Sequence, residues 1–430
     1  MPLLDRHCQR AAFNARRLRD LEGFGPWASD PVFLALRNTT KGKFQSPIRL
    51  FELFAGLGTG YIAHHCLLLP VELVGHLEIS ETLRSFILKL HGTSASVRIG
   101  LDGDIMRLIL ANLPIVDVLI AGPPCPPFSG IGARQCWSDC RTHPFWRTLD
   151  IIAHLARNGL WFFIIENVEG FGYEQSDGCI PVLEVIEVLQ EKLGPQASSG
   201  WSLDYQTYNA SDFCLPQNRP RIYLVGRKSF GKSPKKVLRF HNTVGLSDIL
   251  SFRGTVPSSG AFMPRDLNET ELDNLKHFKV SLRAKMYDPK MAGKVACFPY
   301  DRTPSSRTKW TPQVHIEKAP CLTATGPVLF FLSLGQAGTS STRGSKHPSV
   351  CRVAFPVERG AIQGLPCWYI TGRSKPVDTV RAVGNSMALP VLVSVLAREY
   401  IFYAGLQFPD LPEVVRRPNG FTLMENTVRL

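Results

Sequence analysis

The most constraining feature of the sequence is the stretch AGPPCPPFSG at 121–130, which follows the apolar run VDVLIAG at 116–122. The apolar run predicts a buried strand. Prolines on both sides of Cys125 fix φ and leave few backbone N–H groups to pair, so the thiol should lie on a stiff loop at the strand's carboxyl end. Open α/β sheets place their active sites at that edge. Because a free cysteine is commonly a buried structural residue, the neighbouring motifs must decide its role.

A second apolar run, WFFIIENVEGF at 161–171, ends in polar residues. Its first half predicts a strand buried on both faces, so Glu166 should emerge at the same sheet edge as Cys125. A carboxylate at a strand end can simply be solvated or can cap the next helix. Beside a hydrophobic wall, however, its pKa can rise until the carboxyl group donates a proton near neutrality. A thiolate and a protonatable carboxyl group together predict covalent, acid-assisted chemistry.

A glycine-rich turn in LFELFAGLGTGY at 50–61 separates a predicted strand from the helical stretch YIAHHCLLL. Gly56, Gly58 and Gly60 permit positive φ and let a ligand approach the backbone at a helix start. Tyr61 stands where the dinucleotide fingerprint requires its last glycine, so a nicotinamide or flavin dinucleotide is disfavoured. S-adenosylmethionine is the better candidate.

Two later positions support a nucleoside site. Glu78 ends the predicted strand VELVGHLEI, where a carboxylate can hold ribose hydroxyls. Asp104 and Ile105 in LDGDIM could take the edge and the face of an adenine ring. Each of these residues could equally be an ordinary strand-end or turn residue.

Taken in order along the chain, the motifs resemble those of the DNA (cytosine-5) methyltransferases. The resemblance covers roughly residues 48–230 and 350–405. It is carried by LFAGLGTG at 53–60, Glu78, GDI at 103–105, GPPCPPFS at 122–129, ENVEGF at 166–171, QNRPRIYLVG at 217–226 and VGNSMALPV at 383–391. It implies an α/β fold in which a Rossmann-like methyltransferase sheet is joined to a smaller mixed target-recognition domain.

The chain departs from the family pattern at a few positions. Thr59 replaces a common glycine, and Pro126 follows the cysteine where glutamine is frequent. The stretch 352–366 matches a family motif only loosely, with Leu365 where phenylalanine is usual, and we expect it to have a packing role. None of these changes removes a reacting group.

The resemblance implies methyl transfer from S-adenosylmethionine to carbon 5 of cytosine, with extrusion of the base from the duplex. Attack by the Cys125 thiolate on carbon 6 would make carbon 5 nucleophilic. Glu166 would contact ring nitrogen 3 and the exocyclic amine, while Asn167 would fix the loop. Arg221 and Arg219 would hold the base's carbonyl oxygen and neighbouring phosphates, and would supply part of the positive field that a thiolate needs. Either arginine could instead form a surface ion pair.

The cofactor-binding positions implied by the resemblance include Asn385 and Ser386 at the methionine end, although Ser386 also suits the N-cap of the next helix. The full predicted cofactor set is Phe54, Gly56, Gly58, Glu78, Asp104, Ile105, Pro124, Asn385 and Ser386. The segment from Pro126 to Phe145 should form a mobile loop that closes over the extruded base. Within it, two cysteines and a histidine lack a fourth ligand at a zinc-like spacing, so no metal site is predicted.

At 430 residues the chain is long for one domain. We expect a basic N-terminal extension over 1–47, a catalytic and cofactor-binding domain over 48–230, and a target-recognition domain over 231–375. A helix over 376–405 should return to the catalytic domain, and 406–430 should form a tail. The extension mixes arginines with acidic residues, unlike a transit segment, so it should touch DNA or pack on the lobe. The stretch 320–334 looks strand-like enough to give the second domain a small core.

Charge and composition support a soluble DNA-binding enzyme. Lys and Arg number 49 against 36 acidic residues, a net charge of +13 that suits double-stranded DNA. The irregularly spaced cysteines and the lack of a secretory segment predict reduced thiols inside a cell, in the nucleus of a eukaryote or the cytoplasm of a bacterium. No apolar run approaches the ~20 residues of a membrane span, because Arg398 and Glu399 interrupt the best candidate. We expect a monomer.

Two alternatives share much of this sequence logic. An RNA (tRNA) cytosine-5 methyltransferase would use the same Cys125 and Glu166 chemistry, but with a smaller recognition insert than the long basic interval at 228–345. A catalytically inactive DNA-binding homologue would keep the fold without the reaction. The presence of Cys125, Glu166 and Arg221 counts against that second alternative.

Overall fold

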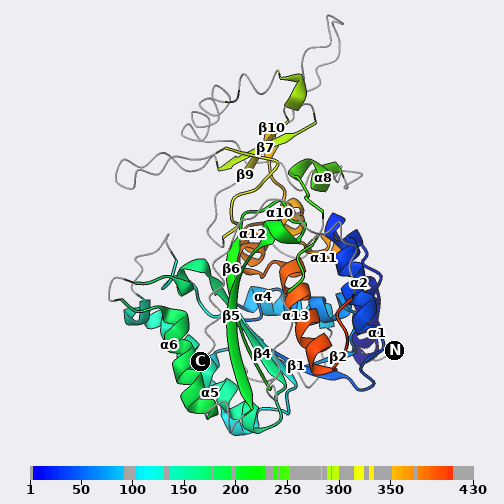
Figure 1. Cartoon of the computed structure of the whole chain (residues 1–430). Coiled ribbons are helices and arrows are strands. Elements are labelled where there is room, and N and C mark those ends of the chain that lie inside the picture. Colours follow the sequence, from blue (N-terminus) through cyan, green and yellow to red (C-terminus); the bar gives the residue numbers. More distant parts are fainter. Residues whose placement is uncertain are drawn as a thin grey trace, which may run out of the picture.

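The computed structural model divides the chain between a large lobe and a small lobe, each built on its own sheet (Figure 1). The structure describes residues 3–91, 103–129, 136–175, 178–194, 200–228, 237–240, 242–251, 282, 288–291, 293–299, 314–323, 329–333, 351–370 and 376–409.

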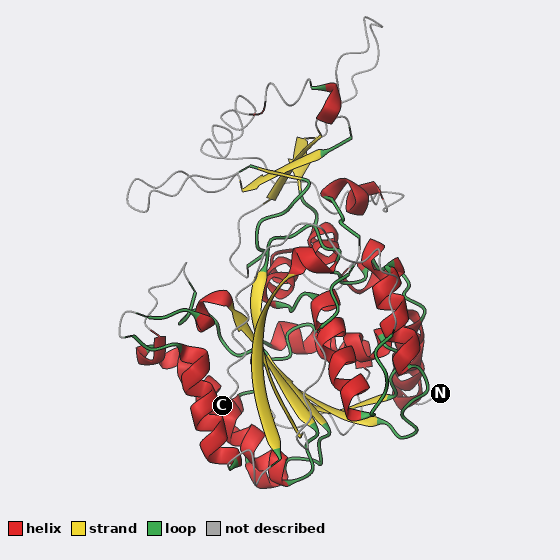
Figure 2. Ribbon diagram, viewed as in Figure 1, coloured by secondary structure: helices red, strands yellow, loops and turns green. Residues whose placement is uncertain are grey.

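The large lobe is built on a six-stranded sheet with the order β2-β1-β3-β4-β6-β5. The first four strands of this order run parallel, and β6 runs antiparallel to both β4 and β5. Figure 2 shows the twist of the sheet. The strands are β1 (Ile48–Leu53), β2 (Val71–Leu77), β3 (Val118–Ala121), β4 (Phe162–Val168), β5 (Trp201–Asn209) and β6 (Pro220–Lys228).

Helices cover both faces of this sheet, and two hydrophobic cores fill the spaces between the layers (Figure 1). On β3, Val118 and Ile120 face one core, whereas Leu119 and Ala121 face the other. Burial on both faces explains why this strand reads as a continuous apolar run. The helices of one face are α5 (His143–Arg157) and α6 (Pro181–Leu193), and those of the other include α3 (Thr59–Cys66), α4 (Glu81–His91) and α13 (Leu389–Tyr403).

The N-terminal extension packs on the large lobe. Its helices α1 (Leu3–Arg19) and α2 (Pro31–Thr40) contact α3, α4 and α13. Trp27 is fully buried, and its indole Nε1 donates to the Gly364 carbonyl oxygen at 3.1 Å. Of the two predicted roles for the extension, the structure supports packing on the lobe.

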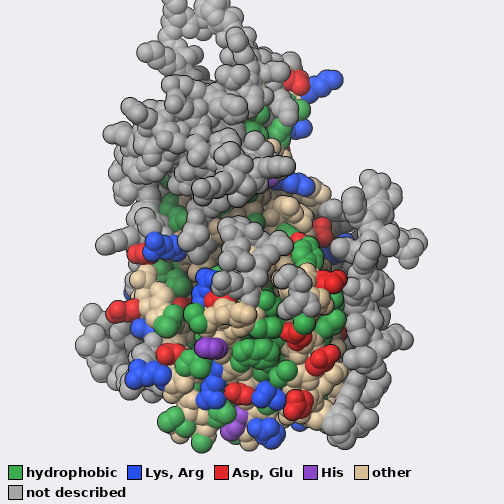
Figure 3. All heavy atoms as spheres, turned by 90° about the vertical axis from the view of Figure 1, so that its left-hand side faces the viewer, with side chains coloured by type: hydrophobic (Ala, Val, Ile, Leu, Met, Phe, Trp, Pro, Cys, Tyr) green, Lys and Arg blue, Asp and Glu red, His purple; other side chains and the backbone are tan. Residues whose placement is uncertain are grey.

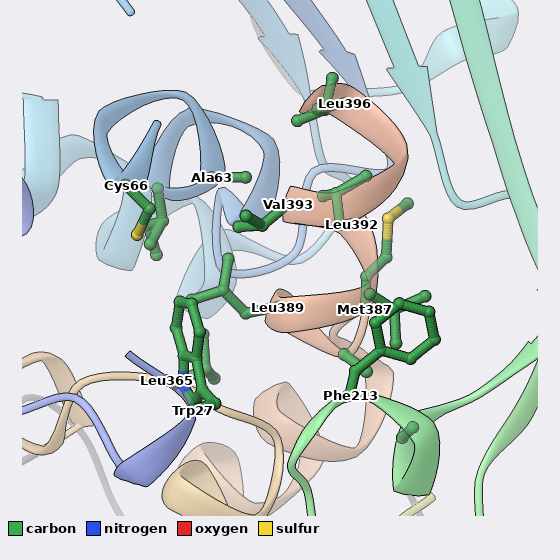
Figure 4. Packing of buried hydrophobic residues seen from close by; sticks show 14 of the residues in the cluster. Trp27, Ala63, Cys66, Phe213, Leu365, Met387, Leu389, Leu392, Val393 and Leu396 are labelled. Carbon is green, nitrogen blue, oxygen red and sulfur yellow. The ribbon is translucent and has the colours of Figure 1, made fainter. Parts of the chain in front are cut away.

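Helix α13 forms a central part of the core. In Figure 4 its Leu389, Leu392 and Val393 lie among apolar side chains from distant parts of the chain, including Trp27 and Ala63. The stretch Asp378–Tyr403 is long and apolar enough for a membrane span, but 83% of its most apolar window is buried inside the protein. It therefore has the character of a core helix.

The charges that interrupt this apolar stretch are buried and paired. Arg398 and Glu399 on α13 form a network with Arg227 on β6 and Asp204 on β5. Arg227 Nε lies 2.6 Å from Glu399 Oε2. The network connects the C-terminal helix to the antiparallel edge of the sheet, and each buried charge has a partner of opposite sign.

The small lobe contains a four-stranded antiparallel sheet with the order β10-β9-β7-β8. In the described part of the predicted strand region 320–334, residues 329–333 are strand and Cys321 to Thr323 form an irregular segment. The strands are β7 (Val295–Pro299), β8 (His315–Ile316), β9 (Leu329–Ser333) and β10 (Cys351–Val353).

The chain returns to the large lobe earlier than the predicted boundary at 376. The Tyr369 hydroxyl donates to the Leu57 carbonyl oxygen at 2.8 Å, and Ile362 and Leu365 belong to the large-lobe core. The stretch 352–366 thus has the packing role expected of it. Further α-helices in the described part of the chain are α8 (Leu246–Ser251), α10 (Pro356–Ile362), α11 (Cys367–Ile370) and α12 (Pro376–Asn385).

Candidate active site

The carboxyl edge of the parallel strands gathers the predicted motifs. Leu53 of β1 pairs with Ala121 of β3, which in turn pairs with Ile165 of β4. The glycine-rich turn, the proline–cysteine loop and Glu166 therefore all leave the sheet at the same level, as expected from the sequence.

The glycine-rich turn uses its glycines in two ways. Gly56 and Gly58 adopt φ of 53° and 68°, the left-handed conformation predicted for them, and Phe54 shares it at 55°. Gly60 lies inside α3, so the expected positive φ is wrong at this position. A glycine is needed at position 60 because there is no room for a side chain. A Cβ there would lie 2.7 Å from both Glu52 Oε1 and Ile120 Cδ1.

Glu78 connects this turn to the end of β2. Its carboxylate accepts hydrogen bonds from the backbone N–H groups of Gly56 and Ser80, each at 2.9 Å. Burial raises its pKa, while these two donors and Arg84 oppose that shift. A Cβ at Gly103 would lie 2.1 Å from the Glu78 carbonyl oxygen, so the GDI segment packs directly against Glu78.

The GDI segment differs in detail from what was expected. Asp104 caps a short 3-10 helix by accepting from the Met106 N–H at 2.9 Å, and Ile105 is buried in the core. The exposed apolar side chains beside these positions are Ile79, 72% exposed, and Met106, 49% exposed. Neither residue was predicted from the sequence, although each directly follows a predicted position, Glu78 or Ile105.

A small cavity connects the glycine turn to the end of β4 and to the start of the C-terminal helix. It brings together Phe54, Gly56, Glu166, Asn385 and Ser386 of the predicted site. The other predicted residues lie outside its lining, namely Gly58, Glu78, Asp104, Ile105, Pro124, Cys125, Arg219 and Arg221. Glu52, Thr59 and Met387, which the sequence analysis did not select, also line it.

Ser386 does not cap the following helix. The N-cap of α13 is Ala388, and the Ser386 hydroxyl donates to the Val383 carbonyl oxygen at 2.8 Å. Gln363, also missed, donates through its Nε2 to the Ser386 carbonyl oxygen at 2.9 Å. These bonds fix the cavity-lining backbone at the junction of α12 and α13.

The proline–cysteine loop and the ENVEGF segment pack against each other. Asn167 Nδ2 donates to the Pro123 carbonyl oxygen at 3.5 Å. Gly170 lies so close to Phe128 that a Cβ would stand 2.3 Å from the Phe128 carbonyl oxygen. The backbone around Cys125 is thus held by the segment that carries Glu166.

The loop predicted to be mobile, Pro126 to Phe145, is packed into the structure near both of its ends. Phe128 and Phe145 are buried in an aromatic cluster with Trp137 and Phe171, and Phe145 belongs to α5. Residues 136–138 and 140–142 form 3-10 helices, and 130–135 lie outside the described residues. In the described part of the chain, no three His, Cys, Asp or Glu side chains converge as a metal site.

Glu166 faces a cation and not the hydrophobic wall that the sequence analysis expected. In the β4–β6 register, Glu166 pairs with Tyr223 and Val168 with Arg221, so Glu166 and Arg221 share a face. Arg221 Nε lies 3.4 Å from Glu166 Oε1. Among the described residues, this buried oxygen has no hydrogen-bond partner.

Arg219 is engaged by the protein's own backbone. It is 3% exposed, and its guanidinium donates to the carbonyl oxygens of Leu322, Gly384 and Ser386. These contacts link the small lobe, β6 and the cavity wall, and the predicted contact with a base or phosphate stays a prediction. This arginine is buried and does not form a surface ion pair.

The Cys125 thiol lies in the electrostatic field of these groups. Burial raises its pKa above the usual range, and Arg221 and Arg219 oppose this shift while Glu166 adds to it. In this conformation the thiol form is favoured at neutral pH, although the arginines were expected to favour the thiolate.

The surface beside helices α5 and α6 carries no large patch of a single charge among its described residues. Figure 3 shows basic and acidic side chains interspersed there around apolar ones. The excess of positive charge is therefore not concentrated on the described part of this face.

Comparison with known proteins places this site in a family. The model of the C-5 cytosine-specific DNA methylases matches residues 48–399. The orphan methyltransferase M.Rho11sI of Bacillus phage rho11s is 28% identical over 42% of this chain and 33% of its own length. The type II methyltransferase M.NlaIV of Neisseria lactamica is 35% identical over 29% of this chain and 28% of its own length. The alignments thus span about a third or less of these two relatives.

Solved structures share the fold. A DNMT2 mutant of Spodoptera frugiperda superposes with a TM-score of 0.52 at 17% identity, covering 82% of this chain and 99% of its own. The Dnmt2 methyltransferase of S. pombe gives 0.51 at 17% identity, covering 82% and 98%. The fold is therefore that of an α/β methyltransferase with a Rossmann-like sheet. Given the match over most of its length, the chain belongs to the C-5 cytosine-specific DNA methylase family.

Proposed function

We propose that the protein transfers a methyl group from S-adenosylmethionine to carbon 5 of cytosine in double-stranded DNA. The observation that carries the proposal is the buried Glu166 carboxylate, which lines the cavity, ion-pairs with Arg221 and keeps Oε1 without a hydrogen-bond partner among the described residues. An unsatisfied buried acceptor is costly unless a ligand completes it. A cytosine presents N–H donors at its exocyclic amine and, when protonated, at ring nitrogen 3.

The residues around the glycine turn fit a nucleoside-containing methyl donor. Gly56 and Gly58 hold the turn before α3 in the left-handed conformation, Gly56 lines the cavity, and Glu78 stands beside Gly56 with a carboxyl group suited to ribose hydroxyls. Ile79 and Met106 offer apolar surface for an adenine ring. When bound, S-adenosylmethionine would supply an electrophilic methyl group.

Cys125 would provide the nucleophile. Its sulfur would form a bond to carbon 6 of the cytosine, and carbon 5 would then take the methyl group. Loss of the proton from carbon 5 and cleavage of the bond between sulfur and carbon 6 would release the product. Because burial raises the pKa of this thiol, formation of the thiolate is a step that the bound substrate must favour.

Glu166 and Arg221 would bind the base from one face of the β4–β6 pair. Glu166 would accept from the exocyclic amine and ring nitrogen 3, and Arg221 would donate to the carbonyl oxygen. Arg219 would act as a positioning residue, because its terminal nitrogens already bond backbone carbonyl oxygens.

The partner and the cellular setting follow from the reaction. A stacked base cannot be attacked from above its ring, so the target cytosine would be extruded from the duplex. The net charge of +13 favours a polyanionic substrate. The protein would act as a monomer wherever the cell keeps its DNA, in a nucleus or a bacterial nucleoid.

Transfer of a radiolabelled methyl group to unmethylated duplex DNA and, in parallel, to tRNA tests this function. Label in DNA that Cys125→Ser abolishes is the expected result. Label in tRNA alone would indicate an RNA methyltransferase instead. Absence of label from both substrates, with retained binding of S-adenosylmethionine, would refute catalysis and favour a DNA-binding homologue.

A further inference from the structure

A second thiol lies beside the two arginines of the site. Cys321 belongs to the segment 314–323, which leaves the small lobe and contacts the loop before β6. The backbone of this segment is fixed there, because the Ala319 N–H donates to the Pro216 carbonyl oxygen at 2.6 Å. The Leu322 carbonyl oxygen accepts from Arg219 Nη1.

Both guanidinium groups point at the sulfur of Cys321. Arg221 Nη2 lies 3.4 Å from Sγ, and Arg219 Nη1 lies 3.6 Å from the same atom. These distances are within the range for hydrogen bonds to sulfur, and they join three side chains from two lobes. Cys321 is therefore not an isolated cysteine but the centre of a cationic pair.

The charges of this cluster do not balance without the sulfur. Arg219 is 3% exposed, and the Arg221 side chain is 12% exposed. Among the described residues, the only carboxylate in an ion pair with either arginine is Glu166, which pairs with Arg221. Two buried cations with one anion leave an excess positive charge in a poorly solvated place, where a further anion is strongly favoured.

We propose that Cys321 is a thiolate at neutral pH that serves as the counter-ion of Arg219 and Arg221 and holds the Arg221 guanidinium beside Glu166. The counter-ion itself does not depend on the proposed function. Its consequence, that Cys321 is a positioning residue for methyl transfer, rests on that function.

The arginines lower the pKa of both thiols of the site, but the net pKa shifts of the two thiols have opposite signs. Burial raises the pKa of Cys321, but attraction and hydrogen bonding by Arg219 and Arg221 more than offset this, so its pKa lies below the usual value. Cys125 experiences the same two cations together with the Glu166 carboxylate, and its pKa is raised. The geometry explains the contrast, because only Cys321 has both guanidinium groups within hydrogen-bonding distance.

The counter-ion is tested by the ultraviolet absorbance of the thiolate. The full-length chain carrying Cys125→Ser is compared near pH 7 with the same chain carrying Cys321→Ser in addition. The other cysteines are common to both, so the difference spectrum reports Cys321 alone. We expect the absorbance of about one thiolate in the difference at pH 7, so the midpoint should lie below pH 7 and well under the ~8.5 of an ordinary thiol. A difference that appears only above pH 7 would overturn the proposal.

Adding Arg221→Gln to both chains of the comparison provides a matched control. Removal of one cation should shift the midpoint of the Cys321 difference spectrum upwards. An unchanged midpoint would mean that the arginine pair does not hold the thiolate, and the counter-ion would be rejected even if a low midpoint were found.

The positioning role is tested by methyl transfer with the native Cys125. Cys321→Ala and Cys321→Ser should lower kcat/KM about tenfold, the size expected for one charge-assisted hydrogen bond, whereas the anionic Cys321→Asp should retain most of the activity. Activity restored by serine and not by aspartate would assign the residue to packing and overturn the role. If the wild type transfers no methyl group, the proposed function fails, while the absorbance still decides the counter-ion.

Discussion

Lowering the pH from about 7 to about 5.5 should destabilise the fold through buried histidines beside the glycine turn. Burial lowers the pKa of His64 and of His76 to about 4 and that of His65 to about 3, and it also lowers the pKa of His91. A histidine in the unfolded chain titrates near ~6.5. Since the folded values lie below the unfolded one, the stability these residues contribute is complete above pH ~6.5 and is lost as the pH falls toward 4.

One buried carboxyl group reduces the expected loss in the free energy of unfolding. Over this interval His64, His65 and His76 each withdraw about 1.2 kcal/mol from the free energy of unfolding, about 4 kcal/mol together, and His91 adds a loss of the same sign. Burial raises the pKa of Glu52 to about 8. Protonation of Glu52 as the pH falls therefore adds about 2 kcal/mol to the free energy of unfolding. The wild type should therefore lose at least about 2 kcal/mol.

Urea unfolding at the two pH values, in the wild type and in Glu52→Gln, measures both effects. The glutamine can still accept the Tyr61 N–H that Glu52 Oε1 accepts, but it does not titrate. Its loss on acidification should approach about 4 kcal/mol. The exposed His143 gives a control, since His143→Gln should behave as the wild type. Stability in Glu52→Gln that is unchanged by acidification would refute the reasoning.

Three further predictions concern the Cys125 thiol, the contact of Gly170 with Phe128 and the ion pair of Arg227 with Glu399. Burial raises the pKa of Cys125, so single-turnover methyl transfer should accelerate from about pH 7 to about pH 9, and a flat profile would contradict this. Gly170→Ala should slow methyl transfer about tenfold to a hundredfold with unchanged circular dichroism, because its Cβ would stand 2.3 Å from the Phe128 carbonyl oxygen. An unaffected rate would mean that the two loops can move apart without loss of activity. Arg227→Met should lower the free energy of unfolding by about 3 kcal/mol, since Glu399 loses a buried partner 2.6 Å away; a loss below about 1 kcal/mol in urea unfolding would count against the network.

A matched glycine provides the control for the loop contact. At Gly25 the nearest atom to an added Cβ is 3.8 Å away, an ordinary contact, and φ is negative. Gly25→Ala should therefore leave methyl transfer unchanged. Equal losses in both variants would point to a general effect of alanine and not to the contact with Phe128.

Sequence patterns sufficed where local physics decides the structure. Apolar runs buried on both faces identified β3 and β4, and their shared edge followed from parallel pairing. The left-handed turn at Gly56 and Gly58 followed from residue type alone. These features depend on residues close in the chain and on pairing within the sheet. Both produce patterns that can be recognised in the sequence.

Long-range packing was not predictable in the same way. Arg219 differs from Arg221 by only two positions, yet it bonds carbonyl oxygens from two distant segments, and no local pattern encodes those partners. The position of Cys321 depends on how the small lobe returns to the loop before β6. The burial of Phe145 likewise depends on three aromatic side chains outside its own helix turn.

The covalent bond between Cys125 and a cytosine is the central claim, and DNA that contains 5-fluorocytosine tests it most directly. Fluorine at carbon 5 replaces the proton whose loss would release the enzyme, so the adduct should persist after methyl transfer. We predict a protein–DNA species that survives denaturation, requires S-adenosylmethionine, maps by mass spectrometry to the peptide with Cys125 and is absent from Cys125→Ser. Methylation of ordinary DNA without any trapped species on the fluorinated DNA would contradict the account.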